Sequence, residues 1–310
     1  MLTGTELKLF AKDNGIHAVG WFAASDFAQY LETIRERDEY HHIAYRSETA
    51  FLKAGHLPAG IMTVVVLVMD YFVETSDRSA DFRMSNYVRT CWNTVGPKTK
   101  AMAEFLKAHG CRADTVDVPQ RAAACRAGLG FIGRNTMFYA GELGSYVGIA
   151  SLGTDAVLEA PATAQERFKH PQCEKCGRCV AACPMAAIPP AGYQIDPMRC
   201  LSMANRHPDE PKRIMPQNPE QLERWLYGCE TCQNVCPLNA EARHRYEAVV
   251  VPEIRIEGMT LPNTATVARE MVATRQDAIT SPGYHEYIRR LLDNQGEPVA
   301  GGDGDPAPQP

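Results

Sequence analysis

The amino-acid sequence predicts an α+β fold in two parts, a larger part of mixed helices and strands followed by a smaller part rich in cysteine. The run 61–72 is dominated by valine and follows Pro58-Ala59-Gly60, which is typical of a strand covered on both faces. Residues 82–109 carry a long helical pattern. Eight cysteines lie between 173 and 236, where regular periodicity is weak, so ligand bonds are expected to order that part.

The other segments complete the predicted secondary structure, and the chain as a whole is predicted to have four regions. Further helices are predicted at 3–14, before Gly15, at 26–37, and at 120–126, after Pro119. Further strands are predicted at 17–24, 113–118 and 145–152, with a glycine-rich loop at 127–133. Strand and helix patterns return over 249–294, and the composition of the last stretch is that of a disordered tail. The predicted regions are residues 1–165, 166–245, 246–295 and 296–310.

Composition and charge are ordinary for a soluble globular protein. The chain has 310 residues, of which 45% are hydrophobic and 22% charged. The net charge of −5 provides no global electrostatic footprint for nucleic acid, although a local basic patch stays open. The N-terminus shows no export signal, and the longest apolar run, 61–69, is too short to span a bilayer. We expect a cytoplasmic protein that does not enter a membrane.

The cysteines indicate metal binding, because the cytoplasm keeps thiols reduced and disfavours disulfides. The first motif is Cys173-x-x-Cys176-x-x-Cys179-x-x-x-Cys183-Pro184. Three sulfurs at this spacing surround one 4Fe–4S cubane, and the fourth cysteine, followed by proline, binds the other cluster in two-cluster ferredoxins. A zinc ribbon also uses paired cysteines, but this run is a poor zinc pattern.

A second motif completes a two-cluster, ferredoxin-like module. It is Cys229-x-x-Cys232-x-x-x-Cys236-Pro237, which lacks one cysteine that Cys200 can replace. The predicted ligands of one cluster are Cys173, Cys176, Cys179 and Cys236, and those of the other are Cys183, Cys200, Cys229 and Cys232. Two clusters predict an oxidoreductase or an electron-transfer protein. The other three cysteines, Cys91, Cys111 and Cys125, are expected to be small buried apolar residues.

Three stretches resemble the epoxyqueuosine reductases, which are cobalamin-dependent iron–sulfur enzymes related to the reductive dehalogenases. They are AGLGFIGRN at 127–135, ELGSYVGIASLGTD at 142–155 and YGCETCQNVCPLN at 227–239. The resemblance implies a mixed α/β sandwich that binds the corrinoid and packs against the ferredoxin-like module. It also implies reduction of epoxyqueuosine to queuosine in tRNA, a step of queuosine biosynthesis, with electrons from an external low-potential donor such as ferredoxin or flavodoxin.

The resemblance also implies how the corrinoid is bound. Cobalamin would be base-off, without a protein ligand to cobalt. Glycines let a backbone approach such a large flat ligand closely. The residues that match the family's motifs, and that we therefore predict to contact the corrinoid, are Gly128, Gly130, Gly133, Arg134, Asn135, Gly144 and Ser145.

A proton donor is implied as well. In the family it is an aspartate upstream of the glycine loop, and counting back from Arg121 places Asp114 on it. Asp117 is the alternative if the register slips. A carboxylic acid beside an apolar macrocycle is expected to have a raised pKa, which suits a general acid. The competing interpretation is that Asp114 is a turn or cap residue.

The chain departs from the family in three places. Residues 91–93 read Cys-Trp-Asn where the family shows Asp-Tyr-His, and the expected proline is displaced to Pro119. The chain ends about where the family's tRNA-gripping helical repeats begin, which predicts a short form. Local basic residues would then hold tRNA, and the candidates are Arg199, Arg206, Lys212 and Arg213.

Two other functions therefore stay open. One is a reductive dehalogenase-like or other corrinoid-dependent reductase of a small molecule. The other is a ferredoxin-type carrier without corrinoid. The sequence gives no indication of oligomeric state.

Overall fold

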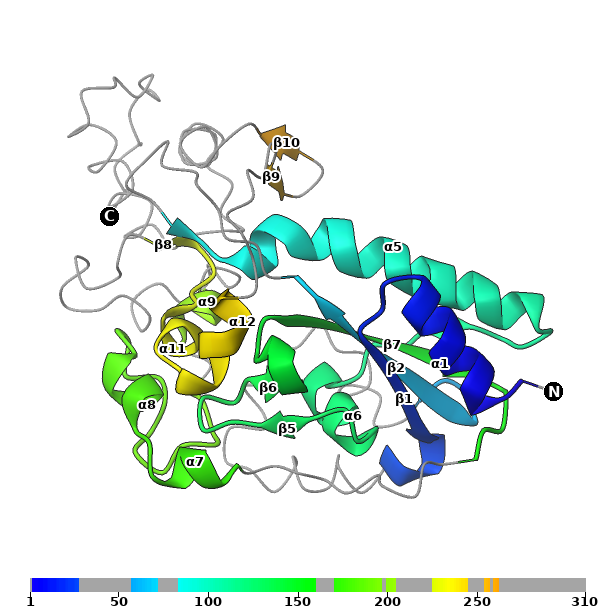
Figure 1. Cartoon of the computed structure of the whole chain (residues 1–310), viewed down its shortest axis with the longest axis horizontal. Helices are drawn as coiled ribbons and strands as arrows, with labels where there is room; N and C mark the ends of the chain where they lie inside the picture. The colour runs from blue at the N-terminus through cyan, green and yellow to red at the C-terminus, as the bar shows by residue number, and fades with distance from the viewer. Residues whose placement is uncertain are drawn as a thin grey trace, which may run out of the picture.

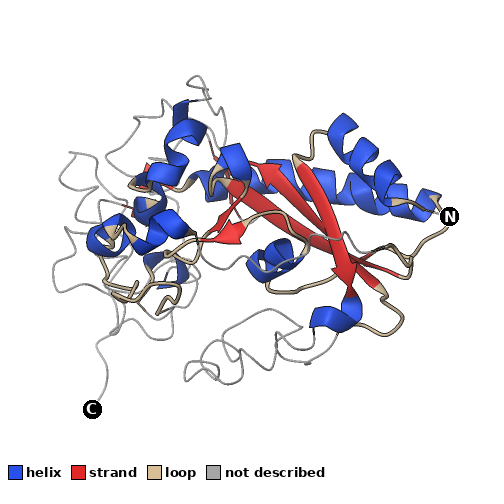
Figure 2. Ribbon diagram, turned by 60° about the horizontal axis from the view of Figure 1, so that its bottom comes forward, coloured by secondary structure: helices blue, strands red, loops and turns tan. Residues whose placement is uncertain are grey.

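A four-stranded antiparallel sheet forms the centre of the protein (Figures 1 and 2). The computed structural model describes residues 2–27, 57–71, 83–159, 170–196, 199–204, 225–244, 254–256 and 259–261. The strand order is β1 (Ala18–Ala23), β2 (Thr63–Asp70), β7 (Val147–Thr154) and β4 (Asp114–Thr115). Strands β2 and β7 pair along their whole length, from Thr63 opposite Thr154 to Asp70 opposite Val147.

Strand β2 is central because both of its faces are apolar. Successive side chains of a strand point to opposite faces, so a run without polar residues requires cover on both sides. Val64, Val66 and Val68 enter one core, and Val65, Leu67 and Met69 enter the other. All six side chains are fully buried. The prediction of a doubly covered strand is confirmed, with bounds a few residues inside the valine-rich run.

Helices and a short hairpin cover the two faces (Figure 2). Helices α1 (Gly4–Asp13) and α5 (Asn86–Ala108) pack on one face through side chains such as Leu7, Met102 and Leu106. Helix α6 (Gln120–Arg126) packs on the other face with its run of small residues. The hairpin of β5 (Phe131–Ile132) and β6 (Phe138–Tyr139) contributes Phe138 to the same core. The predicted mixture of helices and strands is therefore confirmed.

The ends of the helices follow local signals. Thr3 caps α1 in a capping box, in which its hydroxyl accepts from the Glu6 N–H and the Glu6 carboxylate accepts from the Thr3 N–H. Gly15 and Gly110 follow α1 and α5 with φ of +65° and +73°. Helix α5 begins four residues later than predicted, because β3 (Arg83–Met84) precedes it and pairs with β8 (Trp225–Tyr227).

Other predicted boundaries are also adjusted. Strand β4 is shorter than the segment 113–118, and β7 extends two residues beyond the predicted 145–152. Strand β5 begins inside the predicted loop 127–133, because Phe131 and Ile132 pair with β6. The predicted helix at 26–37 lies outside the described residues except for the end of the 3-10 helix η1 (Ala24–Phe27).

A module of short helices lies at the end of the sheet where β7 begins, away from the N-terminus (Figure 1). Its elements are α7 (Pro171–Glu174), α8 (Arg178–Ala182), α9 (Leu201–Ala204), α11 (Thr231–Asn234), the 3-10 helix η4 (Pro237–Asn239) and α12 (Ala240–His244). Strands β9 (Ile254–Ile256) and β10 (Met259–Leu261) form a separate hairpin. The region boundaries predicted at 165, 245 and 295, and the predicted tail, lie outside the described residues. None of the described helices has the length and apolar character needed to cross a bilayer.

Candidate cluster site and its junction with the sheet

The first predicted set of cysteines gathers around Cys236. Burial, followed by the neighbouring Cys236 thiol, raises the pKa of Cys179 to about 11. Burial also raises the pKa of Cys173, and Cys236 and Cys176 are the thiols that add to the effect. Three cysteines of the first motif therefore share their surroundings with a cysteine some sixty positions away, which the sequence had assigned to the same set.

The second set gathers in the same way. Burial raises the pKa of Cys229 to about 12, and Cys200 and Cys183 are the neighbouring thiols that add to it. Burial likewise raises the pKa of Cys232, whose thiol neighbours in order of effect are Cys229, Cys200, Cys183 and then Cys179 of the first set. The neighbours agree with the predicted division into two adjoining sets, while the role of each thiol as an iron ligand stays a prediction.

The donor chemistry of the two sets fits the predicted clusters. Soft thiolates are the ligands that iron–sulfur clusters take, and each set offers four. No three His, Cys, Asp or Glu side chains among the described residues are arranged to hold a single metal ion.

Arg134, in the turn after β5, places a positive charge beside the first set. Its backbone N–H hydrogen-bonds the Cys173 thiol, and both this bond and the guanidinium charge oppose the burial that raises the pKa of Cys173. Its buried Nε atom has no hydrogen-bond partner among the described residues. Its Nη atoms approach the carbonyls of Pro190 (3.4 Å) and Glu174 (3.5 Å). A cation with a spare buried donor suits a neighbour that carries negative charge, as a thiolate-ligated cluster does.

Asn135 and Tyr139 connect the hairpin to both cysteine sets. The Tyr139 hydroxyl donates to the Cys236 Sγ at 3.2 Å. The Asn135 Nδ2 donates to the Tyr139 hydroxyl at 3.1 Å and to the Cys232 carbonyl at 3.4 Å. Burial first, and then the Cys236 charge, raises the pKa of Tyr139 well above its ordinary value. The phenol therefore keeps its proton at physiological pH and acts as a donor.

A second, fully buried polar contact lies where β7 begins. The Asn239 Oδ1 accepts from the Ser145 N–H at 2.8 Å, and the Asn239 Nδ2 donates to the Ser145 Oγ at 2.8 Å and to the Gln233 carbonyl at 2.9 Å. The Ser145 hydroxyl donates to the Gln233 Oε1 at 3.1 Å. Next to it the Tyr146 hydroxyl donates to the Asn234 Oδ1 at 2.8 Å. We use the name junction for two groups of hydrogen bonds, those described here at the start of β7 and those that Asn135 and Tyr139 make to the module.

The glycines predicted to approach a corrinoid are accounted for by packing within the protein. A Cβ added to Gly130 would overlap the carbonyl oxygen of Tyr139, and one added to Gly133 would press on the ring of the same tyrosine. Gly144 has φ of +59°, and its Cβ would overlap the Asn239 side chain. Gly128 ends α6 with φ of +73°. Contact of these residues with a corrinoid stays a prediction.

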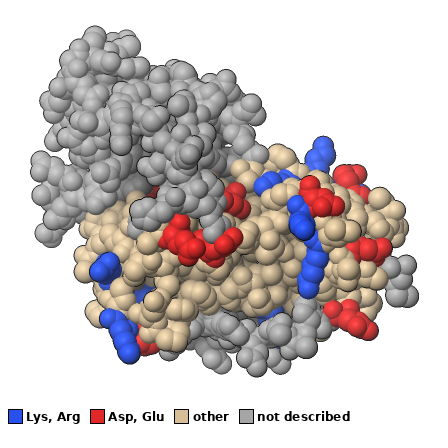
Figure 3. Space-filling model, in the orientation of Figure 1, with Lys and Arg blue, Asp and Glu red and all other residues tan. Residues whose placement is uncertain are grey.

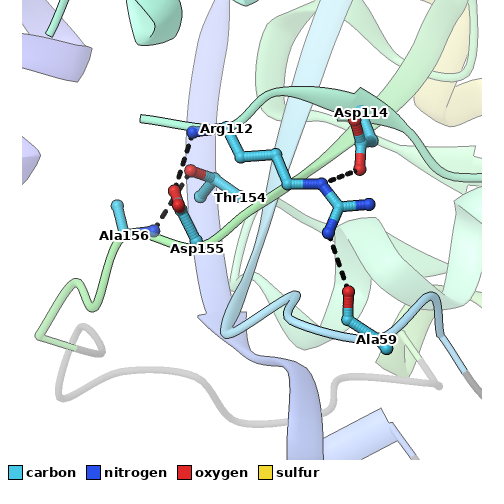
Figure 4. Close-up of polar contacts among 6 residues, drawn as sticks. All are labelled: Ala59, Arg112, Asp114, Thr154, Asp155 and Ala156. Carbon is cyan, nitrogen blue, oxygen red and sulfur yellow. Dashed lines mark hydrogen bonds and ion pairs between the residues drawn. The ribbon is translucent and has the colours of Figure 1, made fainter. Parts of the chain in front are cut away.

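Asp114, the predicted proton donor, lies in the edge strand β4 and is ion-paired with the Nε of Arg112 (Figure 4). Arg112 also donates from Nη1 to the Ala59 carbonyl at 2.8 Å and from its backbone N–H to Asp155 at 2.7 Å. Asp114 pairs with Gly153 near the far end of β7. Gly153 is six positions along β7 from Val147, the residue that follows Ser145 and Tyr146 of the junction, and this distance is about 20 Å. The structure thus gives Asp114 a structural partner; its role as an acid stays a prediction.

The sequence assigned the cysteines of the segment 227–239 but not its polar residues. Gln233, Asn234 and Asn239 lie in the junction, where two of them are almost fully buried. The one feature of the sequence that could have indicated their role is that these polar amides lie in and beside a cysteine motif although they are not predicted ligands of a cluster. Arg199 is exposed, and the other three basic candidates for tRNA lie outside the described residues. On the face in Figure 3, acidic and basic side chains are interspersed over the described part.

Comparison with known proteins identifies the cysteine-rich part. The family model described as a 4Fe-4S double cluster binding domain matches residues 172–239. Over 257 residues the chain is 29% identical to an epoxyqueuosine reductase of Leadbetterella byssophila, covering 77% of this chain and 80% of the relative. It is 34% identical over 205 residues to the corresponding protein of Gloeobacter violaceus, covering 61% of each.

Solved structures show the same fold. An epoxyqueuosine reductase of Bacillus subtilis, with its catalytic loop swung out of the active site, superposes with a TM-score of 0.66 at 21% identity and covers 93% of this chain and 79% of its own. That of Streptococcus thermophilus gives a TM-score of 0.66 at 19% identity, over 96% and 82%. An epoxyqueuosine reductase in complex with an epoxyqueuosine-modified tRNA stem loop gives a TM-score of 0.62 at 21% identity, over 93% and 79%.

Proposed function

We propose that this chain, which is related to the epoxyqueuosine reductases, is a cobalamin-dependent iron–sulfur reductase that converts epoxyqueuosine to queuosine in tRNA. The observation that carries the proposal is the junction. The stretches 127–135, 142–155 and 227–239, which carry the resemblance, are far apart in sequence, yet Asn135 and Ser145 hydrogen-bond the residues of the third. The three similar stretches therefore meet in the fold, beside a module that matches a double-cluster family, and this supports the proposal.

The two sets of four thiols would hold two 4Fe–4S clusters. When bound, the clusters supply single low-potential electrons and base-off cobalamin supplies the reductive chemistry at the substrate. A cytoplasmic ferredoxin or flavodoxin is the proposed donor of those electrons. The chain's own contribution is to hold the module in one position: Asn135, Tyr139 and Asn239 bond it to the sheet domain, and Arg134 places a cation beside Cys173.

The corrinoid is proposed to lie against the backbone of the glycine-rich segment, on the α/β domain that we interpret as a sandwich. Backbone contact is the form that the structure supports, because the side chains of Arg134, Asn135 and Ser145 are turned to the module. The glycine Cβ directions are filled by Tyr139 and Asn239.

Retention of a corrinoid separates the enzyme functions from a simple electron carrier. The full chain is reconstituted anaerobically with iron and sulfide, offered cobalamin and passed through a gel-filtration column. A base-off corrinoid spectrum that elutes with about eight irons per chain supports the proposal. Loaded clusters with no retained corrinoid would leave only the ferredoxin-type carrier.

The substrate is tested with tRNA that bears epoxyqueuosine. Reduced, corrinoid-loaded protein should form queuosine in that tRNA. If the loaded protein forms none, the tRNA substrate is wrong and a small-molecule corrinoid reductase becomes the better proposal. The stem-loop complex of a structural neighbour and the identity to other epoxyqueuosine reductases favour tRNA. The exposed Arg199 is a candidate contact.

The proton donor is proposed to be Asp114, with Asp117 as the alternative. Asp114→Asn removes the acid but also weakens the ion pair with Arg112. Because that pair is half exposed, its loss should cost less than about 1 kcal/mol of stability. Asp114→Asn should therefore stay folded, keep both spectra and lose turnover, whereas Asp117→Asn should keep turnover. The reverse pattern would transfer the role to Asp117, and unchanged turnover in both variants would remove it from either residue.

A further inference from the structure

Two thiols of the first set receive hydrogen bonds from outside the module, Cys173 from the Arg134 backbone N–H and Cys236 from a side chain. The Tyr139 hydroxyl, on β6 of the sheet domain, lies 3.2 Å from the Cys236 Sγ. Two hydrogen bonds to thiols of the second set come from within the module. They are those of the Ala187 N–H to the Cys183 Sγ at 3.3 Å and between Thr231 Oγ1 and the Cys229 Sγ at 3.4 Å.

The single phenol proton of Tyr139 has two acceptors within reach, the Cys236 Sγ at 3.2 Å and the Asn135 Oδ1 at 3.3 Å. The Asn135 Oδ1 has the Met137 N–H as another donor at 3.3 Å, so this oxygen stays satisfied when the phenol proton points to Cys236. The Asn135 Nδ2 instead donates to the phenol oxygen. The result is a chain of donors from Asn135 through Tyr139 to Cys236, in which each bond strengthens the next.

The ring of Tyr139 is held in this position. It is 2% exposed, and the Phe131 ring stacks on it at 5.3 Å with an interplanar angle of 5°. Gly133 lies against its edge, where no larger residue fits. A hydrogen bond from a fixed, buried donor does not have to be ordered again each time an electron arrives.

We propose that Tyr139 raises the reduction potential of the cluster held by Cys236 and its three partners, so that docking of the module on the sheet domain tunes this cluster and leaves the other unchanged. A donor to a ligand sulfur withdraws charge from it and stabilises the more negative, reduced cluster, and such bonds are a main determinant of cluster potentials. The inference rests on the cluster assignment under Proposed function but needs neither the corrinoid nor tRNA.

The test is Tyr139→Phe in the full, anaerobically reconstituted chain. Phenylalanine keeps the ring and its stacking and removes only the hydroxyl. Redox titration followed by electron paramagnetic resonance should show one of the two midpoint potentials shifted to a more negative value and the other unchanged. The matched control is Tyr146→Phe, which removes a buried hydroxyl at the same junction that donates to the Asn234 Oδ1. Neither potential should move in the control.

The outcomes separate this inference from the proposed function. Unchanged potentials in a Tyr139→Phe chain with its full iron would overturn the inference alone, as would equal shifts in both tyrosine variants. A wild-type chain that takes up far fewer than about eight irons would overturn the cluster assignment and the inference together.

If Tyr139→Phe fails to load iron, the wild-type chain is prepared with 3-fluorotyrosine in place of tyrosine. The more acidic phenol is a stronger donor, so one potential should shift to a more positive value. No shift in that chain would equally overturn the inference.

Discussion

Replacing Asn239 with alanine should weaken the attachment of the module to the sheet domain and lower the stability of the protein. Asn239 is fully buried and makes three hydrogen bonds of 2.8 to 2.9 Å, to the Ser145 N–H, the Ser145 Oγ and the Gln233 carbonyl. After the substitution the Ser145 N–H loses its partner inside the protein, whereas the Ser145 hydroxyl keeps Gln233 Oε1 and the Gln233 carbonyl keeps the Cys236 N–H at 3.1 Å. At about 1 to 3 kcal/mol for one unsatisfied buried group, Asn239→Ala should destabilise the fold by roughly 1 to 3 kcal/mol.

The assay is urea unfolding of the cluster-loaded chain without oxygen, followed by far-ultraviolet circular dichroism and by the visible absorbance of the clusters. With a urea m-value of about 3 kcal/mol/M, the midpoint should fall by roughly 0.3 to 1 M. The control is Asn14→Ala, which removes an exposed amide bonded to the Phe10 carbonyl and should leave the midpoint nearly unchanged. Equal midpoints for Asn239→Ala and the wild type would refute the inference that this buried contact holds the two parts together.

Two further predictions concern the hairpin and the clusters. Gly130→Ala places a methyl group on the Tyr139 carbonyl and should destabilise the chain by more than about 2 kcal/mol in the same urea assay, because neither backbone can move aside. Gly96→Ala, in an exposed part of α5 where only its chain neighbours come close, should change stability by less than about 1 kcal/mol, because contact of the new methyl group with the Pro97 ring offsets the gain in helix propensity; equal effects of the two would contradict this packing. Cys200→Ser should leave about four irons per chain, whereas Cys111→Ser, outside both sets, should keep about eight. A Cys200→Ser chain that still holds about eight irons would show that Cys200 is not a cluster ligand.

The sequence predicts those parts of the fold that depend on near neighbours. The capping box of α1 needs only Thr3 and Glu6, three residues apart, and the two-sided burial of β2 follows from its uninterrupted apolar run. The start of α5 was placed too early because β3 pairs with β8, about 140 residues further along the chain. A pairing between segments so far apart leaves no periodicity in either of them.

The same distinction applies to the site. The division of the cysteines could be predicted because iron–sulfur geometry fixes their spacing; Cys179 and Cys229 have thiol neighbours from their own predicted sets, and the iron ligands themselves stay a prediction. The roles of Asn135, Ser145 and Asn239 could not, since the hydrogen bonds between Ser145 and Asn239 span 94 residues. Family resemblance pointed to the first two as corrinoid contacts, whereas the structure shows them bonded to the module.

That difference bears on what the glycine-rich segment does. Its glycines bring the hairpin close enough for Tyr139 to reach Cys236, and its Arg134 and Asn135 reach Cys173 and Cys232. A segment expected to bind one cofactor is thus in direct contact with the ligands predicted for two others. If a corrinoid lies against the opposite side of the same backbone, a few residues separate the cluster that delivers the electron from the cofactor that uses it. The hydrogen bonds of this segment would then act on both.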